Sequence, residues 1–180
     1  ARMWSCAIII LCISISGCSK LNDYQTDGTL ALPGLTNTVK VIRDEKGMPY
    51  IYAQNDEDAF RALGFVTAQD RLFQMELTRL FASGRISELA GEKGKSLDVR
   101  MRTIGLRRNA RKYSNMMNPG EKKLWQAYAD GINVYIENHV DSHHLEFKLA
   151  GIRTSRWSVT DSLVIMYYMA WDTSANYKTE

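Results

Sequence analysis

Cysteine is absent from this 180-residue sequence after its first eighteen residues. The three cysteines are Cys6, Cys12 and Cys18, so the rest of the chain can form neither a disulfide nor a thiolate metal site. A basic block is missing too, because 23 basic and 20 acidic residues are spread along the chain and give a net charge of only +3. Nucleic acid is therefore not an expected partner.

Recognisable catalytic motifs are also lacking. The sequence has no Gly-x-Ser-x-Gly elbow, no His-Glu-x-x-His and no glycine-rich phosphate loop. His139 and His143 are four residues apart, but a solvated helix end explains them better than a metal site does. Because no nucleophile is found beside a base, we assign no catalytic residue to this chain and expect no organic cofactor.

A short apolar run lies near the start of the sequence. It covers residues 7–15 and is about half as long as the roughly 20 residues of a membrane-spanning helix, so we predict a cleaved signal peptide over residues 1–17. The tetrapeptide ISGC at residues 15–18 resembles the lipobox of bacterial lipoproteins, which implies that Cys18 is the lipidated first residue of the mature protein. The implied location is extracytoplasmic and membrane-anchored in the periplasm, and Ser19 favours the outer membrane. An ordinary secretory signal that is cut elsewhere is the alternative.

The sequence after this signal contains one β-rich region and several helical patterns. A polar tether over residues 18–35 leads to two β-rich stretches that flank a turn at residues 44–47, which predicts a hairpin. Later apolar residues recur at three- and four-residue spacing, as in amphipathic helices, with Asp56 or Asp58 as the first cap. Helices are predicted over residues 56–84, 85–89, 98–117, 121–140 and 161–169, and residues 143–156 are expected to be irregular.

The first predicted helix carries an unusual polar stretch. Gln69, Asp70, Arg71 and Gln74 lie there among strongly apolar residues. Buried polar groups must be paired, so we predict that these four side chains form a structural network that determines how helices pack. A direct catalytic role is the alternative.

Several motifs follow one another from the hairpin to the last helix. They are Val41-Ile42-Arg43-Asp44 with Gly47 and Pro49, Gln69-Asp70-Arg71, Ser83-Gly84-Arg85-Ile86-Ser87-Glu88-Leu89, Tyr128-Ala129-Asp130-Gly131-Ile132-Asn133, Trp157 with Asp161-Ser162, and Met169-Ala170-Trp171-Asp172. In this order they resemble the α-chain of the penicillin acylase family of N-terminal-nucleophile hydrolases, over residues 34–180. The resemblance implies an α+β fold in which residues 36–180 form a mostly helical α-chain with an N-terminal β-hairpin. In the family this α-chain packs on an αββα β-chain, which is absent from this sequence.

The resemblance also implies an activity. Members of the family are precursors that cut themselves, and the first residue of the β-chain is then the nucleophile, with its own α-amino group as the base. We therefore expect the N-terminal part of an amidase that hydrolyses linear amides, such as a penicillin or cephalosporin side chain, an acyl-homoserine lactone or a related N-acyl compound. The alternative is a non-catalytic helical lipoprotein that binds a partner or lipid.

Three residues near the C-terminal end acquire roles from the resemblance. Met169 matches the pocket methionine of the family, whose flexible apolar side chain suits an acyl group, and Trp171 is expected to line the entrance. Glu180 resembles the α-chain ligand of a calcium ion whose other ligands come mainly from the β-chain; a surface glutamate is the alternative. The family's aromatic residue and arginine are replaced by Asp172 and Thr173, so the substrate preference of penicillin G enzymes does not carry over.

Overall fold

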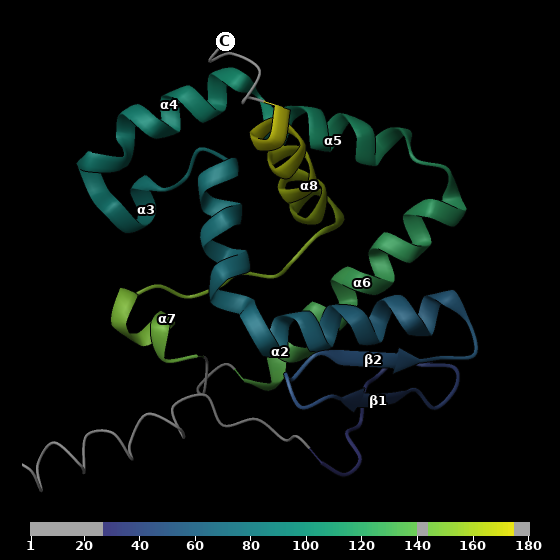
Figure 1. The fold of residues 1–180 in the computed structure, drawn as a ribbon. Coiled ribbons are helices and arrows are strands. Elements are labelled where there is room, and N and C mark those ends of the chain that lie inside the picture. Colours follow the sequence, from purple (N-terminus) through teal and green to yellow (C-terminus); the bar gives the residue numbers. More distant parts are fainter. Residues whose placement is uncertain (1–26, 140–143, 175–180) are drawn as a thin grey trace, which may run out of the picture.

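The computed structural model describes residues 27–139 and 144–174 (Figure 1). This part of the chain contains a two-stranded antiparallel sheet followed by helices, so the predicted mostly helical architecture with an N-terminal hairpin is confirmed. The elements are β1 (Lys40–Arg43), β2 (Pro49–Tyr52), α2 (Asp56–Ala82), α3 (Ser87–Ala90), the 3-10 helix η2 (Gly91–Gly94), α4 (Lys95–Ile104), α5 (Leu106–Met116), α6 (Pro119–Asn138), α7 (Leu145–Ala150) and α8 (Val159–Ser174).

The hairpin turn is held by one aspartate. The Asp44 carboxylate accepts hydrogen bonds from the backbone N–H groups of Lys46 at 3.0 Å and Met48 at 2.8 Å. Gly47 has a φ of +77°, a conformation that glycine adopts without a steric cost. The hairpin lies along the first half of α2 (Figure 1), which brings the end of β1 beside that helix.

The start of α2 differs from the prediction in its cap. Asn55, rather than Asp56 or Asp58, is the N-cap, and its side-chain oxygen accepts a hydrogen bond from the backbone N–H of Asp58 at 2.8 Å. The Asp58 carboxylate is fully buried and accepts from the backbone N–H groups of Thr36 and Asn37, both at 2.9 Å. Burial raises the pKa of Asp58, but the hydrogen bonds from these residues and Asn55 hold it well below its usual value. Asp58 thus ties the segment before β1 to α2.

Two glycines allow α2 and α6 to cross in contact. A Cβ atom on Gly64 would lie 2.0 Å from the Tyr128 carbonyl oxygen, and one on Gly131 would lie 1.9 Å from the Arg61 carbonyl oxygen. Both distances are far below van der Waals contact, and the obstructing atoms are backbone. The two helix backbones therefore touch at this crossing, and only a residue without a Cβ fits at either position.

The buried side chains form two clusters along a bent α2. The bend is at Arg71, whose φ of −150° and ψ of 30° are not helical. The first cluster joins α2 to α6 and α7, and the second joins the end of α2 to α4, α5 and α8. The fold therefore places α8 on the second cluster, away from the hairpin (Figure 1).

Several predicted helix boundaries are wrong. The helix predicted over residues 98–117 is two helices, because Gly105 adopts a left-handed φ of +82° and ends α4. Within the stretch expected to be irregular, α7 forms, and its Phe147 packs edge-on against Phe73 with ring centroids 5.2 Å apart. The last helix continues past Met169 to Ser174.

Candidate functional site

The outer face of α8 is apolar and exposed. Met166 and Met169, one helical turn apart, have 40% and 62% of their surface exposed. Trp171 projects from nearly the opposite side of α8, where it is half-buried against the second cluster and lies 6.4 Å from Tyr168 between ring centroids. The two residues predicted to bind substrate therefore belong to the same half of one helix. Exposed methionines side by side provide a flexible apolar surface of the kind that accommodates varied acyl groups.

The first turn of α8 is anchored by Asp161. Its carboxylate accepts hydrogen bonds from the backbone N–H and the hydroxyl of Ser158 at 2.9 and 2.6 Å, and from the Arg107 guanidinium of α5 at 2.9 Å. Ser158 and Asp161 therefore cap the start of α8 with reciprocal hydrogen bonds. Burial raises the pKa of Asp161, but Ser158, Arg107 and Arg79 outweigh burial and hold it below its usual value.

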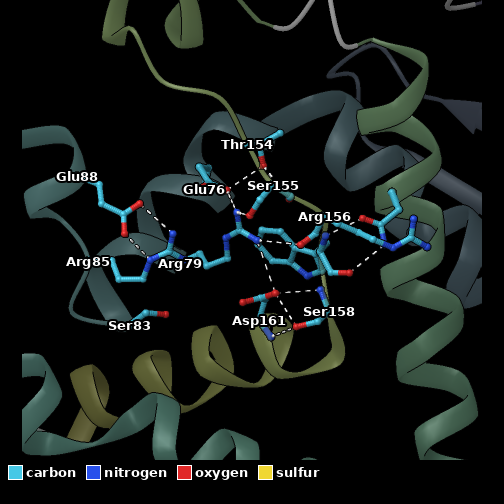
Figure 2. Close-up of polar contacts among 12 residues, drawn as sticks. Glu76, Arg79, Ser83, Arg85, Glu88, Thr154, Ser155, Arg156, Ser158 and Asp161 are labelled. Atoms are coloured by element: carbon cyan, nitrogen blue, oxygen red, sulfur yellow. Dashed lines mark hydrogen bonds and ion pairs between the residues drawn. The ribbon is translucent and has the colours of Figure 1, made fainter.

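Arg79, at the end of α2, is the most deeply buried charged group around this turn (Figure 2). It forms a buried ion pair with Glu76 and lies 3.6 Å from the second carboxylate oxygen of Asp161. It also donates to the Ser155 hydroxyl at 3.0 Å, and its guanidinium lies 4.8 Å from the ring centroid of Trp157. Arg79 and Arg107 balance Glu76 and Asp161, so this buried cluster is close to neutral.

The segment before α8 is held by a second set of bonds. Asn133 of α6 accepts from the backbone N–H of Trp157 at 2.7 Å and donates to its carbonyl at 2.9 Å. The indole N–H of Trp157 donates to the Ser162 hydroxyl at 2.9 Å. We use the name "α8 junction" for Glu76, Arg79, Arg107, Asn133, Trp157, Asp161 and Ser162. The junction joins α2, α5 and α6 to the first turn of α8.

The polar stretch predicted to form a network is only partly buried. Arg43 of β1 donates to both carboxylate oxygens of Asp70 at 2.8 and 3.1 Å, and to Gln69 at 2.9 Å. The structure thus brings Asp70 and Gln69 together with the hairpin. The expected burial of Arg71 and Gln74 is wrong, because both side chains are exposed on the other side of α2.

A buried histidine that the sequence did not single out lies near the end of α6. His144 is 6% exposed, and its Nε2 is 3.0 Å from the Tyr135 hydroxyl. Burial lowers the pKa of His144, and nearby His139 lowers it further, although Glu146, Asp70 and the Gln69 backbone act in the opposite direction. His144 is therefore expected to be neutral in the folded protein at pH 7.

This lowered pKa predicts acid sensitivity. The unfolded chain binds a proton at His144 below about pH 6.5, whereas the folded chain binds it only at lower pH. The contribution of neutral His144 to the free energy of unfolding is therefore fully present above about pH 6.5 and is lost as the pH falls below it. We expect His144→Gln to reduce the loss of melting temperature between pH 7.5 and 5 in the full-length protein. An equal pH dependence in wild type and His144→Gln would contradict the prediction.

Two predicted site residues, Cys18 and Glu180, lie outside the described residues. Within residues 27–139 and 144–174, no three His, Cys, Asp or Glu side chains gather as a metal site. In that same part of the chain, every helix is too short or too polar to cross a membrane.

The fold and the site define this chain as a mostly helical unit whose last helix presents two exposed methionines. Residues 38–180 match the model of the penicillin amidase family. The chain belongs to this family.

Individual relatives agree with this assignment. The acyl-homoserine lactone acylase QuiP of Pseudomonas syringae pv. syringae is 35% identical over 173 residues, which cover 93% of this chain and 21% of the relative. The penicillin acylase 2 proenzyme of a Pseudomonas species is 38% identical over 139 residues, or 77% of this chain and 18% of the relative. A thermostable penicillin G acylase from Alcaligenes faecalis shares the fold, with a TM-score of 0.68, 23% identity and coverage of 77% and 75% of the two chains. The chain thus spans about a fifth of the length of the curated relatives it matches.

Proposed function

We propose that this chain is the N-terminal, α-chain part of a self-processing amidase that hydrolyses linear N-acyl amides. The match of residues 38–180 to the penicillin amidase family carries the proposal. The relatives named as acyl-homoserine lactone acylases and penicillin acylases support this substrate class. The reaction breaks an amide C–N bond with water and releases a carboxylic acid and an amine.

The contribution of this chain is to bind the acyl group. In the proposed enzyme the nucleophile and its base belong to the β-chain, and Met169 supplies an apolar wall for the acyl group, with Trp171 at the entrance. The exposure of Met169 supports this role, because an apolar side chain that is 62% exposed in this chain can still gain contact with a ligand or partner. Asp172 and Thr173 follow on the same helix and are exposed, so the pocket can include polar groups at its rim.

The β-chain is the proposed protein partner. The hairpin exposes several large apolar side chains, and such a concentration on two short strands favours coverage by another protein surface. They are Val41, Ile42, Met48, Tyr50 and Tyr52. Both this hairpin and the methionine face of α8 would then be covered in the assembled enzyme.

Two further features of the protein are proposed from the sequence. Glu180 contributes one carboxylate to a structural calcium site, for which carboxylate oxygens are suitable ligands. A chelator should therefore lower the melting temperature of wild type more than that of Glu180→Gln.

Lipidated Cys18 anchors the protein in the periplasm, at the outer membrane. Cell fractionation of Cys18→Ala tests this anchor. If the variant protein stays in the membrane fraction, lipidation of Cys18 is excluded as the anchor.

Self-cleavage is the property that tests the proposed function most directly. We would measure the intact mass of the protein expressed from the whole gene, and then its hydrolysis of a series of N-acyl homoserine lactones and of penicillin G. Two chains, one of which begins with Ser, Thr or Cys, together with release of the free acid would support the proposal. A single uncut chain without hydrolysis would favour the non-catalytic lipoprotein.

A further inference from the structure

The polar attachments of α8 are concentrated at one end. Among the described residues, side-chain hydrogen bonds and ion pairs from α8 to other parts of the chain come from Asp161 and Ser162. The buried residues of α8 are also confined to its first half, up to Val164. In the second half, Tyr168 packs edge-on against Phe81 of α2 at 5.3 Å, while Met166 and Met169 are exposed.

The methionine face is thus on the half of α8 that only apolar packing holds, while the polar contacts are at the other end. This packing places Ile165, Tyr167, Tyr168 and Trp171 against the second cluster. Met169 follows Asp161 by eight residues, which is about 12 Å along a helix at a rise of about 1.5 Å per residue. A tilt of only about 5° at Asp161 would therefore move Met169 by about 1 Å. A displacement of this size is large enough to change how a bound group fits.

Two arginines from different helices contact Asp161 in the first turn of this helix. Asp161 is 5% exposed and receives Arg107 from α5 at 2.9 Å and Arg79 from α2 at 3.6 Å. Arg107 also donates to the Ser83 hydroxyl at 3.1 Å, just after the end of α2. Because the two arginine contacts to Asp161 come from separate helices, loss of one of them would weaken the attachment of α8 on one side without removing its buried core.

We propose that Arg107 and Asp161 are positioning residues for acyl-group selection, since they hold α8 at the angle that places Met169 in the acyl pocket. The inference rests on the proposed function and extends it from the pocket wall to the residues that orient this wall. It predicts that a weaker junction alters the binding of long acyl groups, which reach the methionine face, more than that of short ones.

Arg107→Gln in the full-length, processed enzyme tests this proposal. The substitution keeps the Arg79 contact and the Ser158 cap of Asp161, so the fold should be retained. We expect KM for a long-chain N-acyl homoserine lactone to rise on the order of tenfold, the effect of about one methylene of lost contact in an apolar pocket. KM for a short-chain lactone and kcat for both should remain close to wild type.

Two further variants control this experiment. Arg111→Gln removes the same charge from an exposed position of α5 and should leave KM for both substrates unchanged. Arg107→Lys retains a cation that can reach Asp161 and should recover part of the lost affinity. An equal fall in kcat for both substrates, or an unchanged KM for the long one, would overturn the proposal and reduce Arg107 to a structural residue.

Hydrogen exchange tests the junction without depending on activity. In Arg107→Gln the backbone amides of α8 should exchange several-fold faster than in wild type, while those of α6 should not change. If α8 exchanges faster in Arg107→Gln but the wild-type protein cleaves no amide, the proposed function is rejected while Arg107 still positions α8. Unchanged exchange in α8 would reject the positioning role, whatever the activity of the wild type.

Discussion

Gly131→Ala is expected to destabilise the protein by about 3 kcal/mol or more, enough to impair folding or processing of the precursor. The new Cβ would lie 1.9 Å from the Arg61 carbonyl oxygen and 2.9 Å from the Phe65 backbone nitrogen. Since both are backbone atoms of α2, no side-chain rotation can relieve the clash. The two helices would have to separate at the centre of the first cluster, where Ile132 is fully buried.

The sign of this effect distinguishes packing from helix propensity. In an exposed helical position, replacement of glycine by alanine stabilises a helix by up to about 1 kcal/mol. Gly120 of the same helix α6 is the matched control, because its Cβ would approach only the Asn118 side chain, at 3.4 Å. We expect Gly120→Ala to raise the melting temperature slightly and Gly131→Ala to lower it by many degrees. Similar melting temperatures and processing yields for the two variants would show that the helices are not in backbone contact.

The elements with strong local signals could be predicted from the sequence. The hairpin follows from β-rich stretches around a turn with Asp44 and Gly47, and the long helices follow from their apolar spacing. Gly105 escaped this reasoning because good helix formers surround it, although an isolated glycine in a helical pattern can mark a C-cap. The break at Gly105 lets α5 turn onto α8, and this contact between distant parts of the chain has no local signal.

The polar residues of α2 that are buried differ from those that the sequence analysis predicted to be buried. Arg71 and Gln74 lie in an apolar stretch of the sequence, which suggested that they are buried. Helical spacing from the buried Leu72 instead places Glu76 and Arg79 on the buried face of α2. The same spacing places Arg71 and Gln74 on the opposite, exposed face. That spacing was a usable signal for a buried charge. The partner Asp161 could not be inferred, because it comes from a helix far along the chain.

Arg79→Met should be the most destabilising removal of a single charge, with an expected cost of about 3–5 kcal/mol in the full-length protein. The substitution leaves Glu76 buried, with the Thr154 hydroxyl, at 2.9 Å, as a remaining hydrogen-bond donor. It also leaves two buried carboxylates, Glu76 and Asp161, with Arg107 as the counter-charge. Equilibrium unfolding in denaturant measures this cost, provided that the variant is processed.

A second pair and a double variant separate the charge effect from the loss of packing. Arg85 and Glu88 form the same i,i+3 pair at the surface, with 32% and 53% of their side chains exposed, so Arg85→Met should cost less than about 1 kcal/mol. Adding Glu76→Met to Arg79→Met removes the uncompensated carboxylate and restores the balance of Asp161 with Arg107. The double variant should therefore be more stable than Arg79→Met alone, since well-packed apolar residues can replace a buried ion pair at little cost. If Glu76→Met instead added its own full cost, the contribution of Arg79 would come from its packing on Trp157 rather than from its charge.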